Sequence, residues 1–216
     1  LGNDPQLEQY SLSFGYDSHG QCTITCISVY GCMHGMVTFI QLVDPVKSFL
    51  VPVKLKIDDF PQFAHRGVLI DTSRRFLSVA TIKEHLELMG ESKMNVLHWH
   101  IVDDHSFPLE LPESFPELAI HGAYSSRAVY TKSDVRSIIE HAAMFGIRVV
   151  PEIDIPGHTW SWTKSHPELI GMAKEAIDPT REENYSFLFI LLKEVAEIFA
   201  SPVTSVGDPL RMHLGG

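Results

Sequence analysis

The hydrophobic pattern divides the chain into two regions with different periodicities. In residues 1–60, short runs rich in β-branched residues alternate apolar and polar positions or run apolar, as strands do. The runs of this kind are Tyr10–Tyr16, Cys22–Tyr30 and Lys47–Ile57. Between the last two runs, Met33–Leu42 has the spacing of one short helix. The first region is therefore predicted to be a small α+β unit, with Asp58–Pro61 as its exit linker.

From residue 61 onward the pattern predicts strands and helices in alternation. The predicted strands are the apolar runs Val68–Ile70, Asn95–Ile101, Ile147–Ile153 and Leu210–Leu214. Helical spacing relates Val79 to Met89, Val135 to Ala142 and Phe187 to Ile198, and Thr131 with Asp134 forms a capping box. Continuously apolar strands between helices indicate a parallel α/β arrangement. Four strands suit an open sheet if the chain is complete, because a (β/α)8 barrel needs eight strands and about 250 residues.

Polar side chains follow each predicted strand of the second region. They lie in the segments Asp71–Arg74, His98–His105, Glu152–Trp160 and His213–Gly216. In parallel α/β folds the catalytic groups collect at the carboxyl ends of the strands. Four successive strands that obey this rule predict a functional site at one edge of the sheet.

Each polar group also has a structural interpretation. His98 and His100 lie on one face of a strand and could be core histidines, or could bind a metal with Asp103, since imidazole and carboxylate suit zinc, iron or manganese. Asp103 or Asp104 could be a helix N-cap. His158 follows Pro-Gly, so a turn presents it. The tryptophans could be core residues or could stack on a sugar ring; they are Trp99, Trp160 and Trp162.

Composition narrows the class of protein. The 216 residues are 44% hydrophobic and 20% charged, which excludes a disordered tail, a collagen-like fibre and a coiled coil. Lys+Arg 17 against Asp+Glu 27 gives a net charge of −10, which disfavours binding to nucleic acid or to an acidic membrane surface. No stretch approaches the roughly 20 apolar residues of a membrane span, and no signal peptide is visible at the start.

Three cysteines and one sequon bear on the compartment. A strand through Cys22 and Cys26 would place them about 13 Å apart, too far for a disulfide between them. All three cysteines, Cys22, Cys26 and Cys32, are predicted to be small core residues, although pairing after a turn or with another chain stays open. Asn184-Tyr185-Ser186 is a sequon for glycosylation of Asn184, a hint of the secretory route.

Several segments together resemble the β-N-acetylhexosaminidases of glycoside hydrolase family 20, in their eukaryotic lysosomal and secreted branch. The matching segments are His65–Arg74, Asn95–Asp104, Pro151–Thr159 and His213–Gly216, with Gly31–Met36 and Phe39–Leu42 in the first region. The resemblance implies an α/β fold: residues 61–216 as strands 1–4, the first half of a (β/α)8 barrel, preceded by residues 1–60 as part of a small α+β domain.

The resemblance also implies a reaction and its substrate. Family members remove terminal, non-reducing N-acetylglucosamine or N-acetylgalactosamine from glycoconjugates with retention. The substrate's own acetamido oxygen attacks the anomeric carbon, so the family departs from the two-carboxylate scheme. No cofactor and no metal are implied. The expected partners are a glycan and a second subunit in a homo- or heterodimer, with no nucleic acid or membrane span, and the expected location is lysosomal or secreted.

Five residues match functional positions of the family. Arg74 matches the arginine that binds the sugar's 3- and 4-hydroxyls, where a planar fork of donors suits two oxygens. Asp103 and His158 match a hydrogen-bonded pair that leads to the general-acid glutamate and sets its pKa. Asp154 and His100 match positions that line or brace the same pocket.

One departure concerns the end of the sequence. The family's His-Leu-Gly-Gly is followed at once by the catalytic Asp-Glu pair, whereas this sequence ends at Gly216. We therefore expect a truncated hexosaminidase whose 216 residues are inactive as they stand. The alternatives are a catalytically dead partner or regulatory fragment, and a metal-dependent hydrolase built on His98, His100 and Asp103.

Overall fold

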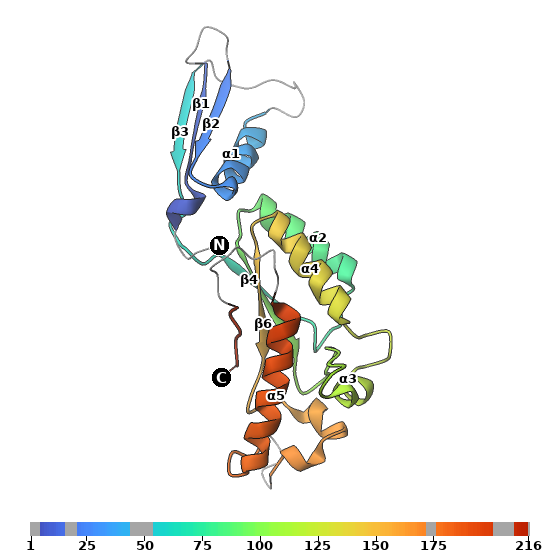
Figure 1. Cartoon of the computed structure of the whole chain (residues 1–216). Helices are drawn as coiled ribbons and strands as arrows, with labels where there is room; N and C mark the ends of the chain where they lie inside the picture. Colours follow the sequence, from blue (N-terminus) through green and yellow to red (C-terminus); the bar gives the residue numbers. More distant parts are fainter. Residues whose placement is uncertain (1–4, 16–20, 44–53, 172–175, 201–209, 216) are drawn as a thin grey trace.

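A computed structural model describes residues 5–15, 21–43, 54–171, 176–200 and 210–215. Its first part is a three-stranded antiparallel sheet with one helix packed against it (Figure 1). The strand order is β2-β1-β3, and a 3-10 helix precedes β1. The elements are η1 (Pro5–Glu8), β1 (Tyr10–Phe14), β2 (Cys22–Cys26), α1 (Val29–Gln41) and β3 (Leu55–Asp59).

The boundaries of this unit differ from the predicted ones because of one cap. β2 ends at Cys26, and Ser28 caps α1 by accepting a hydrogen bond from the Gly31 amide at 3.3 Å. The helix therefore begins at Val29, inside the predicted strand and before the predicted helix start. β3 continues through Asp58 and Asp59, so the predicted linker is partly strand. Tyr16 and residues 47–53 of the predicted strands lie outside the described residues.

The turn before α1 also decides the cysteine chemistry. It brings Cys26 and Cys32 together in a disulfide with a Cα–Cα distance of 5.3 Å. The prediction of three small core residues is therefore wrong for these two. Cys22 is free and partly exposed, and it lies too far along β2 to take part.

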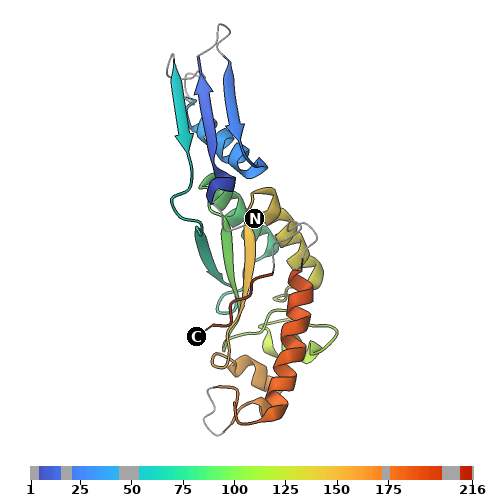
Figure 2. The same ribbon diagram turned by 60° about the vertical axis from the view of Figure 1, so that its left-hand side comes forward.

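The second part is a parallel sheet in the order β4-β5-β6 with helices along one side (Figures 1 and 2). β5 is central and almost wholly buried. The strands are β4 (Gly67–Asp71), β5 (Val96–Val102) and β6 (Arg148–Ile153). The helices are α2 (Val79–Glu91), α3 (Pro116–Gly122), α4 (Lys132–Met144) and α5 (Glu182–Phe199), with the 3-10 helices η2 (Trp160–Lys164) and η3 (Pro167–Leu169).

The periodic apolar positions form the core as predicted. Ile82, Leu86 and Met89 of α2 are buried in one cluster with Val135 and Ile138 of α4. The capping box at the start of α4 is present, because Thr131 and Asp134 each accept from the other's backbone amide. Within the described residues no helix is long and apolar enough to cross a membrane.

The predicted fourth strand, Leu210–Leu214, lies beside β6 but does not form a continuous β-ladder with it. It forms one parallel bridge, between His213 and Glu152. The His213 amide donates to the Pro151 carbonyl at 2.9 Å, and the Ile153 and Ile155 amides donate back across the gap at 3.0 Å each. This segment therefore occupies the place of the next parallel strand without the continuous pairing of one.

The sequon residue Asn184 lies in the first turn of α5 and is only 3% exposed. Its side-chain nitrogen, to which a glycan would be attached, donates to the carbonyls of Leu169 and Asp178 at 2.9 Å each. Both amide hydrogens are therefore engaged in this packing. Glycosylation of Asn184 would require the side chain to give up a contact and stays a prediction.

Candidate functional site

The turn after β4 is built around Asp71. Its Oδ1 accepts hydrogen bonds from the Ser73 and Arg74 amides at 3.0 Å each, and its Oδ2 accepts from Arg74 Nη1 at 2.7 Å. Three hydrogen bonds join Ser73 and Ser106, and they tie this turn to the loop after β5. Asp71 thus fixes both the turn and the direction of the Arg74 side chain.

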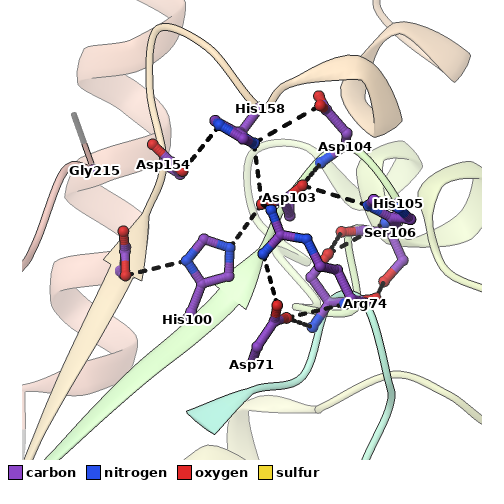
Figure 3. A network of polar contacts seen from close by, with 12 residues as sticks. Asp71, Arg74, His100, Asp103, Asp104, His105, Ser106, Asp154, His158 and Gly215 are labelled. Atoms are coloured by element: carbon purple, nitrogen blue, oxygen red, sulfur yellow. Dashed lines mark hydrogen bonds and ion pairs between the residues drawn. The ribbon is translucent and has the colours of Figure 1, made fainter. Parts of the chain in front are cut away.

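Asp103, directly after β5, is the centre of the site (Figure 3). It is 0% exposed, and its Oδ2 lies 2.7 Å from Arg74 Nη2, 2.8 Å from His100 Nε2 and 3.3 Å from His158 Nδ1. Its Oδ1 accepts from the Asp104 amide at 2.6 Å. Burial raises the pKa of Asp103, but the hydrogen bonds from His100 and the Asp104 amide and the charge of Arg74 outweigh burial and lower it.

His158 projects from the turn after β6, where its backbone has a φ of 58°. Its side chain is half exposed, with Nδ1 toward Asp103 and Nε2 4.0 Å from Asp154 Oδ2 (Figure 3). Asp104 Oδ1 accepts a hydrogen bond from the Trp160 amide at 2.8 Å, which holds this turn against the loop after β5. The ring therefore bridges a buried carboxylate and a second one at the open side of the site.

A second cluster lies around Glu152 of β6. This residue is 6% exposed; its Oε2 lies 2.6 Å from His98 Nε2 and 3.1 Å from His100 Nδ1, and its Oε1 lies 3.3 Å from His213 Nδ1. Burial raises the pKa of Glu152, but the contact with His100 and the charges of the three histidines outweigh it and lower the pKa. His100 connects this cluster to Asp103.

Close packing of the last described residues completes the site. Gly215 has a φ of +79°, and a Cβ at this position would lie 1.7 Å from Asp154 Oδ1. A glycine is therefore required for the chain to pass Asp154, beside which it lies in Figure 3. The chain here also carries His213 to Glu152, so one segment positions groups in both clusters.

The structure brings together four of the five predicted site residues. Arg74, His100 and His158 all contact Asp103, and Asp154 lies at the edge through His158. Sequence reasoning did not select Glu152, although a glutamate two residues before Asp154 in a buried strand points to the same face and was the available signal. Of the three tryptophans, Trp99 and Trp162 are core residues and Trp160 is half exposed.

The trio His98, His100 and Asp103 is not assembled as a metal site. His98 contacts Glu152, whereas His100 lies between Glu152 and Asp103. Among the described residues, three other His, Asp and Glu groupings have ligand atoms close enough to share a cation, and none contains this trio. The metal-dependent hydrolase built on this trio therefore loses its geometric basis.

Three parallel strands with polar side chains at their carboxyl edge are the arrangement of an α/β domain with its site at the strand ends. Comparison with known proteins specifies the family. The family model described as "Glycosyl hydrolase family 20, catalytic domain" matches residues 63–209. The chain belongs to glycosyl hydrolase family 20.

Two curated relatives are the beta-hexosaminidase subunits beta of Mus musculus and Homo sapiens. The mouse protein is 44% identical over 200 residues, which cover 88% of this chain and 35% of that protein. The human protein is 44% identical over 199 residues, which cover 87% and 34%. The chain thus spans about a third of the length of these relatives.

Solved structures agree with this assignment. The chitobiase of Flavobacterium johnsoniae superposes with a TM-score of 0.79 at 35% identity, over 89% of this chain and 30% of that one. The β-N-acetylhexosaminidase of Streptomyces coelicolor A3(2) gives 0.79 at 28% identity, over 93% and 45%. These matches confirm the predicted family and the predicted fold class, part of a (β/α)8 barrel behind a small α+β unit.

Proposed function

We propose that this chain forms part of the sugar-binding pocket of a β-N-acetylhexosaminidase, which removes terminal non-reducing N-acetylglucosamine or N-acetylgalactosamine. The observation that carries the proposal is the convergence of Arg74, His100 and His158 on one oxygen of Asp103, in a domain of family 20. Such a convergence fixes the direction of each side chain before a ligand binds, as a preorganised site requires.

Arg74 is the proposed contact to the sugar ring. Its guanidinium is held by Asp71 on Nη1 and by Asp103 on Nη2, each at 2.7 Å, while its side chain keeps 44% of its surface exposed. A guanidinium has five N–H donors in one plane, so donors remain free on the exposed side for two neighbouring hydroxyls. The family resemblance assigns these as the 3- and 4-hydroxyls.

Asp103 and His158 are the proposed support of a general acid. Asp103 Oδ2 lies 3.3 Å from His158 Nδ1 and orients the ring, so that Nε2, 4.0 Å from Asp154 Oδ2, is turned toward a carboxyl group on the open side. The resemblance implies that this group is a glutamate, which protonates the leaving oxygen while the substrate's acetamido oxygen forms an oxazolinium. Asp154 and His100 brace the same pocket.

The general acid that His158 would support is implied by the resemblance and is not assigned to any of the described residues. We expect a polypeptide of these 216 residues to hydrolyse a chromogenic N-acetylglucosaminide no faster than buffer does. A role as a non-catalytic partner is the second candidate, because the mouse and human relatives are named as subunits. Dimer formation with a longer subunit would favour it.

A lysosomal or secreted location is part of the proposal. The Cys26–Cys32 disulfide supports it, since disulfides persist in oxidising compartments.

Ligand-observed NMR tests sugar binding by the 216-residue chain. Saturation of protein signals in the presence of methyl N-acetyl-β-glucosaminide should transfer most strongly to the ring protons at C3 and C4, which lie nearest Arg74. Arg74→Ala should abolish that transfer, whereas Arg127→Ala, at an exposed arginine outside the site, should leave it intact. Equal transfer in the folded Arg74→Ala protein, or no transfer to the wild type, would refute the proposal.

A further inference from the structure

His100 is a buried imidazole between two buried carboxylates. Nε2 lies 2.8 Å from Asp103 Oδ2, and Nδ1 lies 3.1 Å from Glu152 Oε2. The three residues are at most 6% exposed. Figure 3 shows the ring of His100 with one edge toward Asp103. The contact with Asp103 is a hydrogen bond, and the contact with Glu152 is an ion-pair distance without hydrogen-bond geometry. Each ring nitrogen therefore lies beside a carboxylate oxygen.

The protonation state of such a ring follows from its neighbours. A neutral imidazole has one N–H and one lone pair, and an ionised carboxylate only accepts hydrogen bonds. In either neutral tautomer of His100, one lone pair would face an anionic oxygen about 3 Å away, which is repulsive in a buried site. A second proton on the ring removes that repulsion and turns both contacts into attractive ones.

We propose that His100 is a stably protonated imidazolium at neutral pH, and that Glu152 is the positioning residue that keeps this charge in place against Asp103. The charge of His100 in turn helps to hold Asp103 ionised and aimed at Arg74 and His158. The effect on the orientation of Arg74 and His158 toward a sugar rests on the proposed function. The charge of His100 itself does not rest on it.

The groups around His100 have a net excess of negative charge. The facing carboxylates are Asp71 from β4, Asp103 from the loop after β5, and Glu152 and Asp154 from β6 and its end. Arg74 and His158 contact Asp103 beside His100. His98 contacts the same Glu152 oxygen, Oε2, as His100, and His213 contacts the other oxygen, Oε1. Burial lowers the pKa of His100, but the contacts with Asp103 and Glu152 outweigh it and raise the pKa.

The test is a histidine titration of the 216-residue chain. Nitrogen-detected NMR of a histidine-labelled sample distinguishes an imidazolium, with two equivalent protonated nitrogens, from a neutral tautomer with two different ones. The signals of His100 are those missing in His100→Gln. We expect the imidazolium pattern of His100 to persist at pH values where an ordinary histidine has already lost its proton. A neutral tautomer at neutral pH would overturn the inference.

Two measurements separate the part played by Glu152. Glu152→Gln should lower the midpoint of His100 by at least one pH unit, a tenfold change, while Glu168→Gln, which removes the carboxylate 3.0 Å from His166, should not move it. An unchanged midpoint in folded Glu152→Gln refutes the role. If that variant does not fold, NMR of carbon-labelled wild-type protein replaces it. The chemical shift of the Glu152 carboxyl carbon should change at the pH midpoint of His100, and a constant chemical shift there would refute the role of Glu152.

No sugar is present in this titration. Its failure would leave the proposed function standing, and a failed sugar-binding test would leave the charge of His100 standing.

Discussion

Replacing Asp103 by asparagine should destabilise the chain far more than its surface area suggests. The substitution keeps the shape of the side chain and removes the charge that Arg74, His100 and His158 contact at 2.7, 2.8 and 3.3 Å. The pair with His100 is fully buried, and removing one partner of a buried ion pair costs about 3–5 kcal/mol. The contacts with Arg74 and His158 are half exposed and add little, because solvent screens them.

We therefore expect Asp103→Asn to lower the free energy of unfolding by about 3 kcal/mol. For a chain of this size, that corresponds to a fall of roughly 6–12 °C in Tm. Urea and thermal unfolding followed by circular dichroism would measure both. The matched control is Asp104→Asn, at a carboxylate with 41% side-chain exposure whose contact to the Trp160 amide an asparagine oxygen can keep. A change of less than about 1 kcal/mol in Asp103→Asn would refute the reasoning.

Three further predictions concern pH, backbone packing and the sequon. The free energy of unfolding should fall on acidification, because folding lowers the pKa values of Asp71, Asp103 and Glu152. Their contribution to stability is complete above their unfolded-state pKa values, near pH 4, and is lost as the pH falls through their folded-state pKa values. Urea unfolding across the acid range should show this, and a flat profile would contradict it. In Gly215→Ala, the Ile155 amide, which donates to the Leu214 carbonyl, should exchange its hydrogen faster than in the wild type. Gly157→Ala is the control, because a Cβ there meets nothing within 4 Å, and it should leave that exchange unchanged. Equal exchange in both variants would count against the close approach of Gly215 to Asp154. Asn184→Gln should cost about 1–3 kcal/mol without changing the mass of chain secreted from eukaryotic cells, and a mass lower by one glycan would show that the sequon is used.

Local sequence signals predicted the elements that local interactions determine. The capping box of Thr131 and Asp134 begins α4 because both partners lie within one helical turn. The buried strands and the helix stripes followed from periodicity, and the site lay at the carboxyl edge because parallel strands bring their ends together. That rule placed Arg74, Asp103 and His158 in polar segments at this edge, and the family resemblance then selected them within those segments.

Features that depend on tertiary contacts were missed or misjudged. The disulfide of Cys26 and Cys32 needed the turn at Ser28, which also moved the start of α1. The sequon at Asn184 is defined by three consecutive residues, whereas the burial of its side chain depends on a hydrogen bond to the Leu169 carbonyl, fifteen residues earlier. Glu152 gained its importance from histidines on other segments, because no spacing within β6 shows that three imidazoles surround it.

The central claim is that these residues build the sugar pocket of a family 20 hexosaminidase, and a segment exchange tests it most directly. Residues 63–215 would replace the matched region of the mouse beta-hexosaminidase subunit beta, and hydrolysis of 4-nitrophenyl N-acetyl-β-glucosaminide would be compared with that of the corresponding glucoside. We predict a folded chimera that cleaves the N-acetylated substrate selectively and loses about 100-fold or more in kcat/KM on Arg74→Ala, the loss typical of a key transition-state contact. A folded chimera without that activity, or one in which Arg74→Ala changes nothing, would contradict the account.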